Sequence, residues 1–148
     1  MLIMQTSMLN FVPSICGQTY LYGSHADASV SSRIVTALTM HIDTEKLDQA
    51  LAEAMVRFPQ IAVGLEVSES QRTFVSNEGK VPVFRADEPM PEAFSDPRLG
   101  GYLFRVSYLH KHLYVDFHRA LADEVGMMAF VKALLLRYLE LSGFPVRT

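Results

Sequence analysis

Four residues in one short segment, His110, His112, Asp116 and His118, are of types that bind metal ions. In an extended strand, however, His112 and His118 stand about 20 Å apart at roughly 3.3 Å per residue, whereas each ligand lies about 2 Å from its metal. His110 and His112 flank a tight turn, where they could chelate weakly but are more simply interpreted as solvated residues. We therefore expect no shared metal site, although Asp116 and His118 lie on one strand face and could hydrogen-bond each other.

The stretch from residue 116 to residue 126 combines a strand end, a short turn and an acid that opens a helix. Such a junction could hold His118 rigidly, with the carboxylate of Asp123 close to it. Interpreted chemically, His118 is a candidate general base. Interpreted structurally, Asp123 is an acid at a helix N-terminus, where the helix dipole favours negative charge.

At this junction the sequence resembles the chloramphenicol-acetyltransferase-like, CoA-dependent acyltransferases, which include condensation domains and bacterial alcohol acetyltransferases. Their motif His-His-x-x-x-Asp-Gly lies at a strand end before a helix, and it aligns here with His-Arg-Ala-Leu-Ala-Asp-Glu at residues 118–124. Residues 101–106 and 126–132 flank it and strengthen the match, as do residues 47–59 and the strand after them. The resemblance covers residues 33–143.

Two departures from the motif bear on activity. In the family the second histidine takes a proton from the acceptor hydroxyl or amine, and Arg119 stands at that position. Arginine stays protonated at physiological pH, so Arg119 cannot be that base, and losing a positioned base lowers rates by about 10²- to 10⁴-fold. His118 matches the first histidine, which is not the base, and Glu124 replaces the motif glycine. The motif acid, Asp123, is chiefly structural in the family, and we expect it to pair with Arg119 or Arg105.

Enzymes of this family have two similar halves with the active-site tunnel between them, and residues 1–148 supply only the first. The resemblance therefore implies a single domain that is the N-terminal half of the fold. We expect it to be inactive alone and to act as an acyl-CoA or acyl-carrier binding protein or an assembly subunit. The alternative is an O-acyltransferase in which His118 is a displaced base and a second chain completes the site. No tightly bound cofactor is expected, acyl-CoA is the expected ligand or substrate, and the expected partner is a second copy or a companion chain.

Period-two and period-3.6 patterns of apolar residues predict the elements that position this junction. Strands are predicted over residues 33–42, 61–67, 73–75, 81–84, 102–109 and 112–118, and helices over residues 44–58 and 123–141. Loops are predicted over residues 23–32 and 87–101, the second exposed and mobile because it holds three prolines and two glycines. This order predicts an α+β fold with a mixed or antiparallel sheet and helices on one face.

The last predicted helix is apolar nearly all round, so it is either sandwiched between layers or partly buried by another subunit. We expect a homodimer that buries at least about 1,000 Å² through this helix or through residues 102–109.

Composition limits the function further. The net charge of −3 and the absence of a basic run argue against nucleic-acid binding. Cys16 is the only cysteine, which excludes an internal disulfide. The mildly apolar N-terminus has no Lys or Arg before Arg33, and no stretch reaches the roughly 18 apolar residues of a membrane span. We expect a soluble, cytoplasmic protein without membrane contact.

Overall fold

The structure is a computed structural model that describes residues 6–7, 19–23, 31–67, 72–94, 96–118 and 121–144 of the chain. Its elements are β1 (Thr6–Ser7), β2 (Thr19–Gly23), β3 (Ser31–Ala37), α1 (Thr44–Arg57), β4 (Val63–Val67), β5 (Arg72–Ser76), β6 (Val83–Arg85), the 3-10 turn η2 (Pro97–Leu99), β7 (Phe104–Leu109), β8 (His112–His118) and α2 (Glu124–Leu141). Both predicted helices and the hairpin β7–β8 are confirmed.

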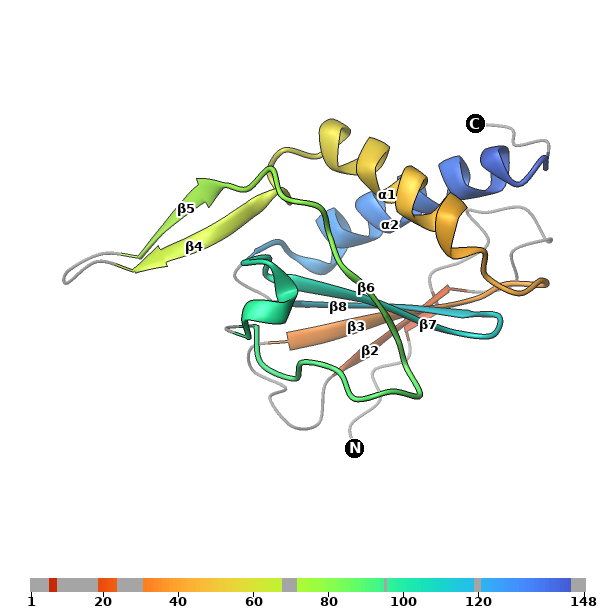
Figure 1. Cartoon of the computed structure of the whole chain (residues 1–148), viewed down its shortest axis with the longest axis horizontal. Coiled ribbons are helices and arrows are strands. Elements are labelled where there is room, and N and C mark those ends of the chain that lie inside the picture. The colour runs from red at the N-terminus through yellow and green to blue at the C-terminus, as the bar shows by residue number, and fades with distance from the viewer. Residues whose placement is uncertain are drawn as a thin grey trace.

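Six strands form one sheet in the order β1-β2-β3-β8-β7-β6. β6 pairs with β7 in parallel, and every other neighbouring pair is antiparallel. α1 and α2 both lie on one face of this sheet, while β4 and β5 form a separate hairpin that projects from the body (Figure 1). The predicted α+β class, with helices on one face of a mixed sheet, is confirmed. The predicted edge position of residues 81–84, which contain Pro82, is also confirmed, because β6 is the last strand.

α1 forms where the sequence carries a cap and a single apolar stripe. The side chain of Asp43 accepts hydrogen bonds from the backbone N–H groups of Glu45 and Lys46. Buried residues recur every three or four positions, at Leu47, Ala50, Leu51 and Ala54. The helix ends at Arg57, with Phe58 as its non-helical C-cap, because Pro59 disfavours a helical conformation for the residue before it.

α2 is covered by its own chain over most of its surface. Eight of its side chains are buried: Met127, Met128, Phe130, Val131, Leu134, Leu135, Tyr138 and Leu139. α2 packs against α1, and both helices lie on the same face of the sheet (Figure 1), so burial within its own chain accounts for much of the apolar character of α2. The predicted homodimer stays a prediction: eight side chains of α2 are covered by its own chain and β7 lies inside the sheet between β8 and β6, whereas Val125 of α2 is 76% exposed.

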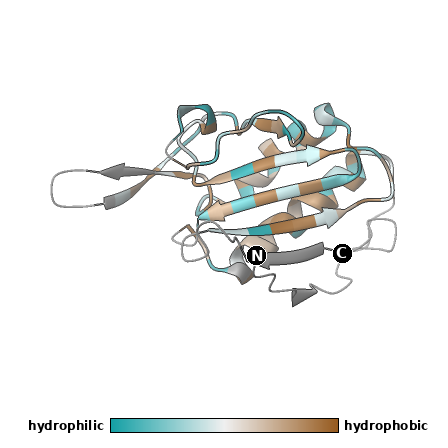
Figure 2. Ribbon diagram, turned by 90° about the horizontal axis from the view of Figure 1, so that it is seen from below, coloured by the Kyte–Doolittle hydropathy of each residue, from teal (hydrophilic) through white to brown (hydrophobic). Residues whose placement is uncertain are grey.

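The two faces of the sheet differ in character. Hydrophobic and hydrophilic residues alternate along β3, β7 and β8 (Figure 2). The face toward the helices is apolar and carries Ile34, Val115, Phe117, Phe104 and Val106, all no more than 1% exposed. The opposite face, called the open face below, carries Arg33, Arg105, Ser107, Tyr114, Asp116 and His118, which are placed there by strand alternation and register.

Several boundaries differ from the prediction. β1 and β2 lie in the N-terminal region, where no strand was predicted. The strand predicted over residues 33–42 begins at Ser31 and ends at Ala37, because its ladder with β8 runs only from Ser31–His118 to Ala37–His112. Of the loop predicted over residues 23–32, Gly23 belongs to β2, Ser31 and Ser32 belong to β3, and residues 24–30 lie outside the described residues.

The predicted loop over residues 87–101 is only partly exposed. Leu99 is 1% exposed and Pro91 is also buried, so this loop packs against the body instead of standing free. The following segment is held to the turn after β5: the Tyr102 hydroxyl donates to the carbonyls of Asn77 and Gly79, and Asn77 Nδ2 donates to the Gly100 carbonyl at 2.9 Å.

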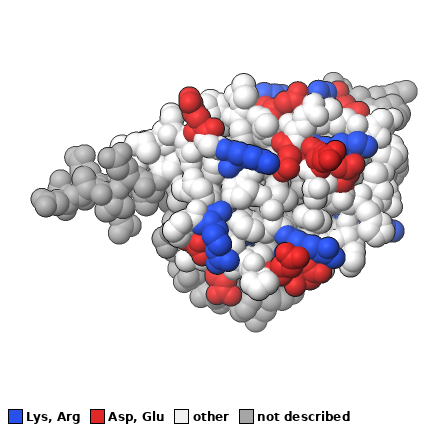
Figure 3. Space-filling view, viewed as in Figure 1, with Lys and Arg blue, Asp and Glu red and all other residues white. Residues whose placement is uncertain are grey.

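Charged side chains on the surface seen in Figure 3 lie in pairs of opposite sign, and no large patch of one sign is visible there. Examples are Lys80–Asp48 at 3.5 Å, Arg85–Asp87 at 2.9 Å and Arg98–Asp96 at 2.8 Å. Among the described residues, no helix combines the length and the hydropathy that a membrane crossing requires.

Candidate functional site

His118 is the last residue of β8, and its backbone is fixed on both sides. Its N–H donates to the carbonyl of Leu103 at 2.9 Å, and its own carbonyl accepts from the N–H of Leu121 at 2.9 Å. The half-buried imidazole lies on the open face and meets the ring of Phe94 edge-on, with 5.8 Å between centroids. The junction thus holds His118 in a defined position, as predicted.

The remaining motif residues are only partly described. Arg119 and Ala120 lie outside the described residues, so the side chain at the base position has no assigned place. Asp123 caps α2, with its Oδ1 accepting from the N–H of Gly126 at 2.7 Å. A Cβ at position 126 would lie 3.2 Å from that oxygen, which is why a glycine suits this close approach. Asp123 is therefore an acid at the N-terminus of α2, the position that the structural interpretation assigned to it.

Within the described parts of the chain, Asp123 forms no salt bridge. Arg105, one of its two expected partners, instead binds Asp116, with Nη2 2.8 Å and Nε 3.2 Å from Oδ2. That expected pairing is wrong because Arg105 and Asp116 are direct neighbours across β7 and β8, where side chains on one face meet.

Asp116 binds a second arginine as well. Arg33 Nε lies 2.6 Å from Oδ1 and Arg33 Nη2 lies 3.2 Å from Oδ2, because Arg33 is the cross-strand neighbour of Asp116 on β3. The three side chains form a row across the open face, called the Arg–Asp–Arg network below. Asp116 and Arg105 are only 13% and 12% exposed, whereas Arg33 is 37% exposed and lies over the Tyr114 ring, 5.0 Å from its centroid.

This network carries one more positive than negative charge. Burial lowers the pKa of Arg33, but the hydrogen bonds and charge of Asp116 outweigh that effect and leave the pKa raised. Arg33 therefore stays charged, and the network as a whole contributes a net positive charge to the open face. The sequence prediction missed this network. The available signal was three charged residues at alternating positions of half-buried strands, but their pairing depends on register.

Among the described residues, His110 and His112 lie at the turn between β7 and β8, and His41 follows β3. His110 has a φ of 54° and meets the ring of His41 edge-on at 5.9 Å, and His112 stacks on Tyr114 at 6.2 Å. No group of three potential metal ligands occurs among the described residues.

One open groove lies away from the motif, between the start of α1 and the edge strand β6. It is lined by Thr44, Asp48, Lys80, Pro82, Val83, Arg85, Glu88 and Tyr108. Acidic and basic side chains are balanced there, so the lining does not select a ligand of either charge.

No protein-family model matches the sequence, and no curated protein matches it either. Solved structures do match the fold. Polyketide synthase associated protein 5 from Mycobacterium tuberculosis gives a TM-score of 0.60 at 20% identity, covering 81% of this chain and 32% of that one. SgcC5 from Streptomyces globisporus gives 0.56 at 18% identity, covering 88% and 32%. The condensation domain that mediates chain release from the enacyloxin polyketide synthase gives 0.55 at 14% identity, covering 80% and 27%.

These matches define the class of fold. The described sheet with its two helices has the fold of part of a condensation domain, and the predicted likeness of fold is confirmed. The chain spans about a third of the length of the solved structures that it matches.

Proposed function

We propose that this chain corresponds to the N-terminal half of a condensation-domain-like acyltransferase fold and binds an acyl thioester together with a second protein segment. On this proposal it does not transfer acyl groups by itself. The observation that carries the proposal is the combination of the fold match with an arginine, Arg119, at the position that aligns with the catalytic base.

The chemistry of the junction supports binding over turnover. Arg119 cannot accept a proton, and Arg33 and Arg105 add positive charge to the open face beside His118. Positive charge suits an anionic ligand such as a CoA derivative, because it attracts phosphate groups over distances of about a Debye length. Asp123 serves as a helix cap and stabilises the turn that precedes α2.

A second candidate function is O-acyl transfer with His118 as a displaced base. The half-buried imidazole at a rigid strand end favours it, since a general base must be both positioned and accessible. In this case a second chain supplies the rest of the site.

One assay separates the two candidates. Purified chain is incubated with acetyl-CoA and a small alcohol or amine, and release of free CoA is followed, while calorimetry measures acetyl-CoA binding. We expect binding without measurable turnover. Turnover by the unmodified chain that His118→Gln abolishes would establish the second candidate, and absence of both binding and turnover would reject both.

A double variant, Arg119→His with Glu124→Gly, tests the motif directly. It restores the residue types of the family motif, so we expect at most weak transfer while the second half of the tunnel is lacking. The matched control is Arg57→His, on the far end of α1, which should leave turnover unchanged. Robust turnover by the double variant alone would contradict the need for a second segment.

We further propose that the second segment is either a companion chain or a second copy. This chain covers 27% and 32% of two of the matched structures, so a complete fold of that kind needs a further segment. Light scattering at micromolar concentration distinguishes a homodimer from a monomer awaiting a companion. If the chain stays monomeric and binds acetyl-CoA without any other protein, both the companion chain and the second copy are rejected as parts of the binding site.

A further inference from the structure

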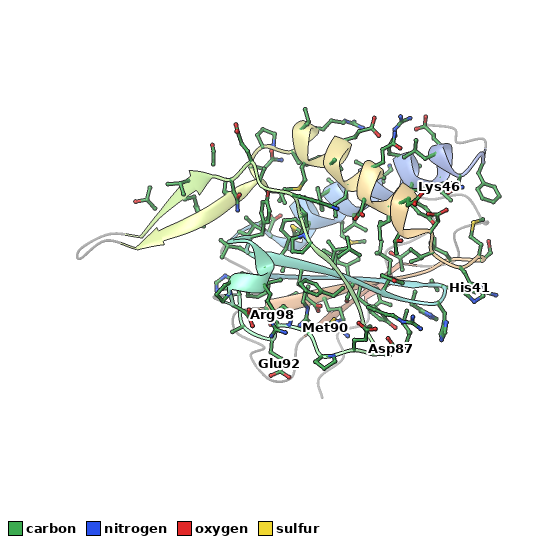
Figure 4. All side chains as sticks on the ribbon, viewed as in Figure 1. His41, Lys46, Asp87, Met90, Glu92 and Arg98 are labelled. Carbon is green, nitrogen blue, oxygen red and sulfur yellow. The ribbon has the colours of Figure 1, made fainter. Side chains whose placement is uncertain are left out.

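One segment between β6 and η2, residues 87–94, runs along the margin of the sheet near the open face and is called the strap below. Figure 4 labels three of its residues, Asp87, Met90 and Glu92, which follow the lower border of the sheet. The strap reaches its far end at Phe94, whose ring contacts His118. The strap therefore follows the margin of the sheet and ends next to His118 of the candidate site.

Two contacts hold the strap to the open face. Arg105 Nη1 donates a hydrogen bond to the carbonyl of Pro91, and Pro91 itself is buried. At the other contact, the ring of Phe94 packs edge-on against the imidazole of His118. Asp87, Glu88, Pro89, Glu92 and Ala93 are exposed, whereas Met90 is half-buried.

Backbone hydrogen bonds do little to fix the strap. The last bond before its middle joins Glu88 N–H to the Arg85 carbonyl, and the next joins Asp96 N–H to the Ala93 carbonyl. Residues 89–92 form no backbone–backbone hydrogen bond with any other described residue. Pro89 and Pro91 have no N–H to offer, so the segment can separate from the sheet without breaking a ladder.

A buried polar group lies close to the same contacts. Ser107 follows Arg105 by two residues on the open face of β7 and is 0% exposed. Its hydroxyl has no hydrogen-bond partner among the described residues. A buried hydroxyl without a partner is unfavourable, and it would gain a bond if a polar ligand replaced its cover.

We propose that the strap is a lid that closes a ligand site formed by Arg105, Ser107 and His118. This inference rests on the proposed function, whose site it regulates. When the lid lifts, Arg105 loses the Pro91 carbonyl and presents a free N–H, and His118 loses the cover of Phe94. Ser107, two residues after Arg105 on the same face, is the neighbouring polar group that a ligand there would meet. The ligand that fits these groups is an extended chain with a carbonyl oxygen for Arg105. From position 118 to the position opposite Ser107, the strand spans four residues, or about 13 Å, which sets the length of that chain.

The first experiment measures the accessibility of His118 without any ligand. Diethylpyrocarbonate modification is followed by mass spectrometry, with His112, an exposed residue of the same strand, as the internal reference. Phe94→Ala should raise the rate of diethylpyrocarbonate modification at His118, relative to that at His112, by about two- to tenfold. This is the increase in the population of the open lid that loss of one edge-on aromatic contact should cause. The matched control, Glu92→Ala, changes an exposed strap residue and should leave the ratio unaltered.

Phe94→Leu keeps the apolar volume and provides the same test if Phe94→Ala fails to fold. A ratio that stays at the wild-type value in the folded variant would overturn the lid. So would equal rates at His118 and His112 in the wild type.

The second experiment uses the absence of tryptophan from the chain. Phe94→Trp places a single fluorophore on the lid, and S-acetyl-N-acetylcysteamine, which carries a thioester and an amide carbonyl, serves as the probe. The probe should shift Trp emission to longer wavelength, whereas the control Phe74→Trp, on the projecting hairpin, should show no shift. Unchanged emission at saturating probe would overturn the assigned ligand class. If acetyl-CoA does not bind but Phe94→Ala raises the ratio of His118 to His112 modification, the proposed function is rejected and the lid is retained.

Discussion

The Arg–Asp–Arg network allows a sharp test of how the open face is held together. Asp116→Asn keeps the shape of the side chain but removes the negative charge that pairs with both Arg33 and Arg105. Two guanidinium groups then face each other across a neutral amide. Arg105, at 12% exposure, has little access to water that could compensate for the lost partner.

The expected loss follows from burial. Removing one member of a buried ion pair lowers stability by about 3–5 kcal/mol. Two features reduce that figure here: Arg33 is 37% exposed, so its share is screened by solvent, and the Asn carbonyl still accepts one hydrogen bond. We therefore expect Asp116→Asn to lower the free energy of unfolding by about 2–4 kcal/mol.

Urea titrations monitored by circular dichroism measure this free energy. The matched control is Arg33→Gln, which removes the exposed arginine and leaves the Asp116–Arg105 pair, and should lower stability by at most about 1 kcal/mol. Adding Arg105→Met to Asp116→Asn removes the unpaired buried charge and should recover part of the loss. A loss below about 1 kcal/mol for Asp116→Asn, or one equal to that of Arg33→Gln, would refute this reasoning.

Two further predictions concern single polar groups. Asp123→Ala should lower the free energy of unfolding by about 1–2 kcal/mol through loss of the cap on α2, and Asp123→Asn should retain most of it; equal melting temperatures for the two variants would contradict this. Burial raises the pKa of Tyr102, so its contribution to stability is present below the unfolded pKa near 10 and is lost as pH rises through the folded pKa, by at most about 1.4 kcal/mol per pH unit. In urea titrations between about pH 9 and pH 11, the free energy of unfolding of Tyr102→Phe should decline less steeply with pH than that of the wild type. Equal slopes for the two proteins would show that Tyr102 does not contribute to this loss of stability.

Elements with a complete local signal were predictable from the sequence. The hairpin β7–β8 has strict alternation and a short turn, and both helices have apolar spacing together with a capping acid, Asp43 or Asp123. The edge position of β6 was predictable for a different reason, since Pro82 removes an N–H that an inner strand would need. In each case the deciding residues lie within a few positions of one another.

Features that depend on contacts between distant segments were not predictable. β1 and β2 are assigned by pairing, because their own residues carry no clear alternation. The salt bridge between Arg33 and Asp116 joins residues 83 positions apart, and only the register of β3 against β8 brings them together. Likewise, the composition of the loop over residues 87–101 indicated exposure, but burial of Leu99 depends on its place against the body.

The fold and the chemistry of this chain also depend on very different numbers of residues. The fold is specified by a core of more than twenty buried side chains, so it persists in proteins that share only 14–20% identity with this chain. On the alignment proposed above, proton transfer depends on one side chain, and an arginine at position 119 would remove it without changing the core. Similarity of fold and loss of a base are therefore compatible, and similarity of fold alone gives no measure of catalysis. For this reason the decisive observations are turnover and ligand binding, with His118 and its cover, Phe94, as the residues to perturb first.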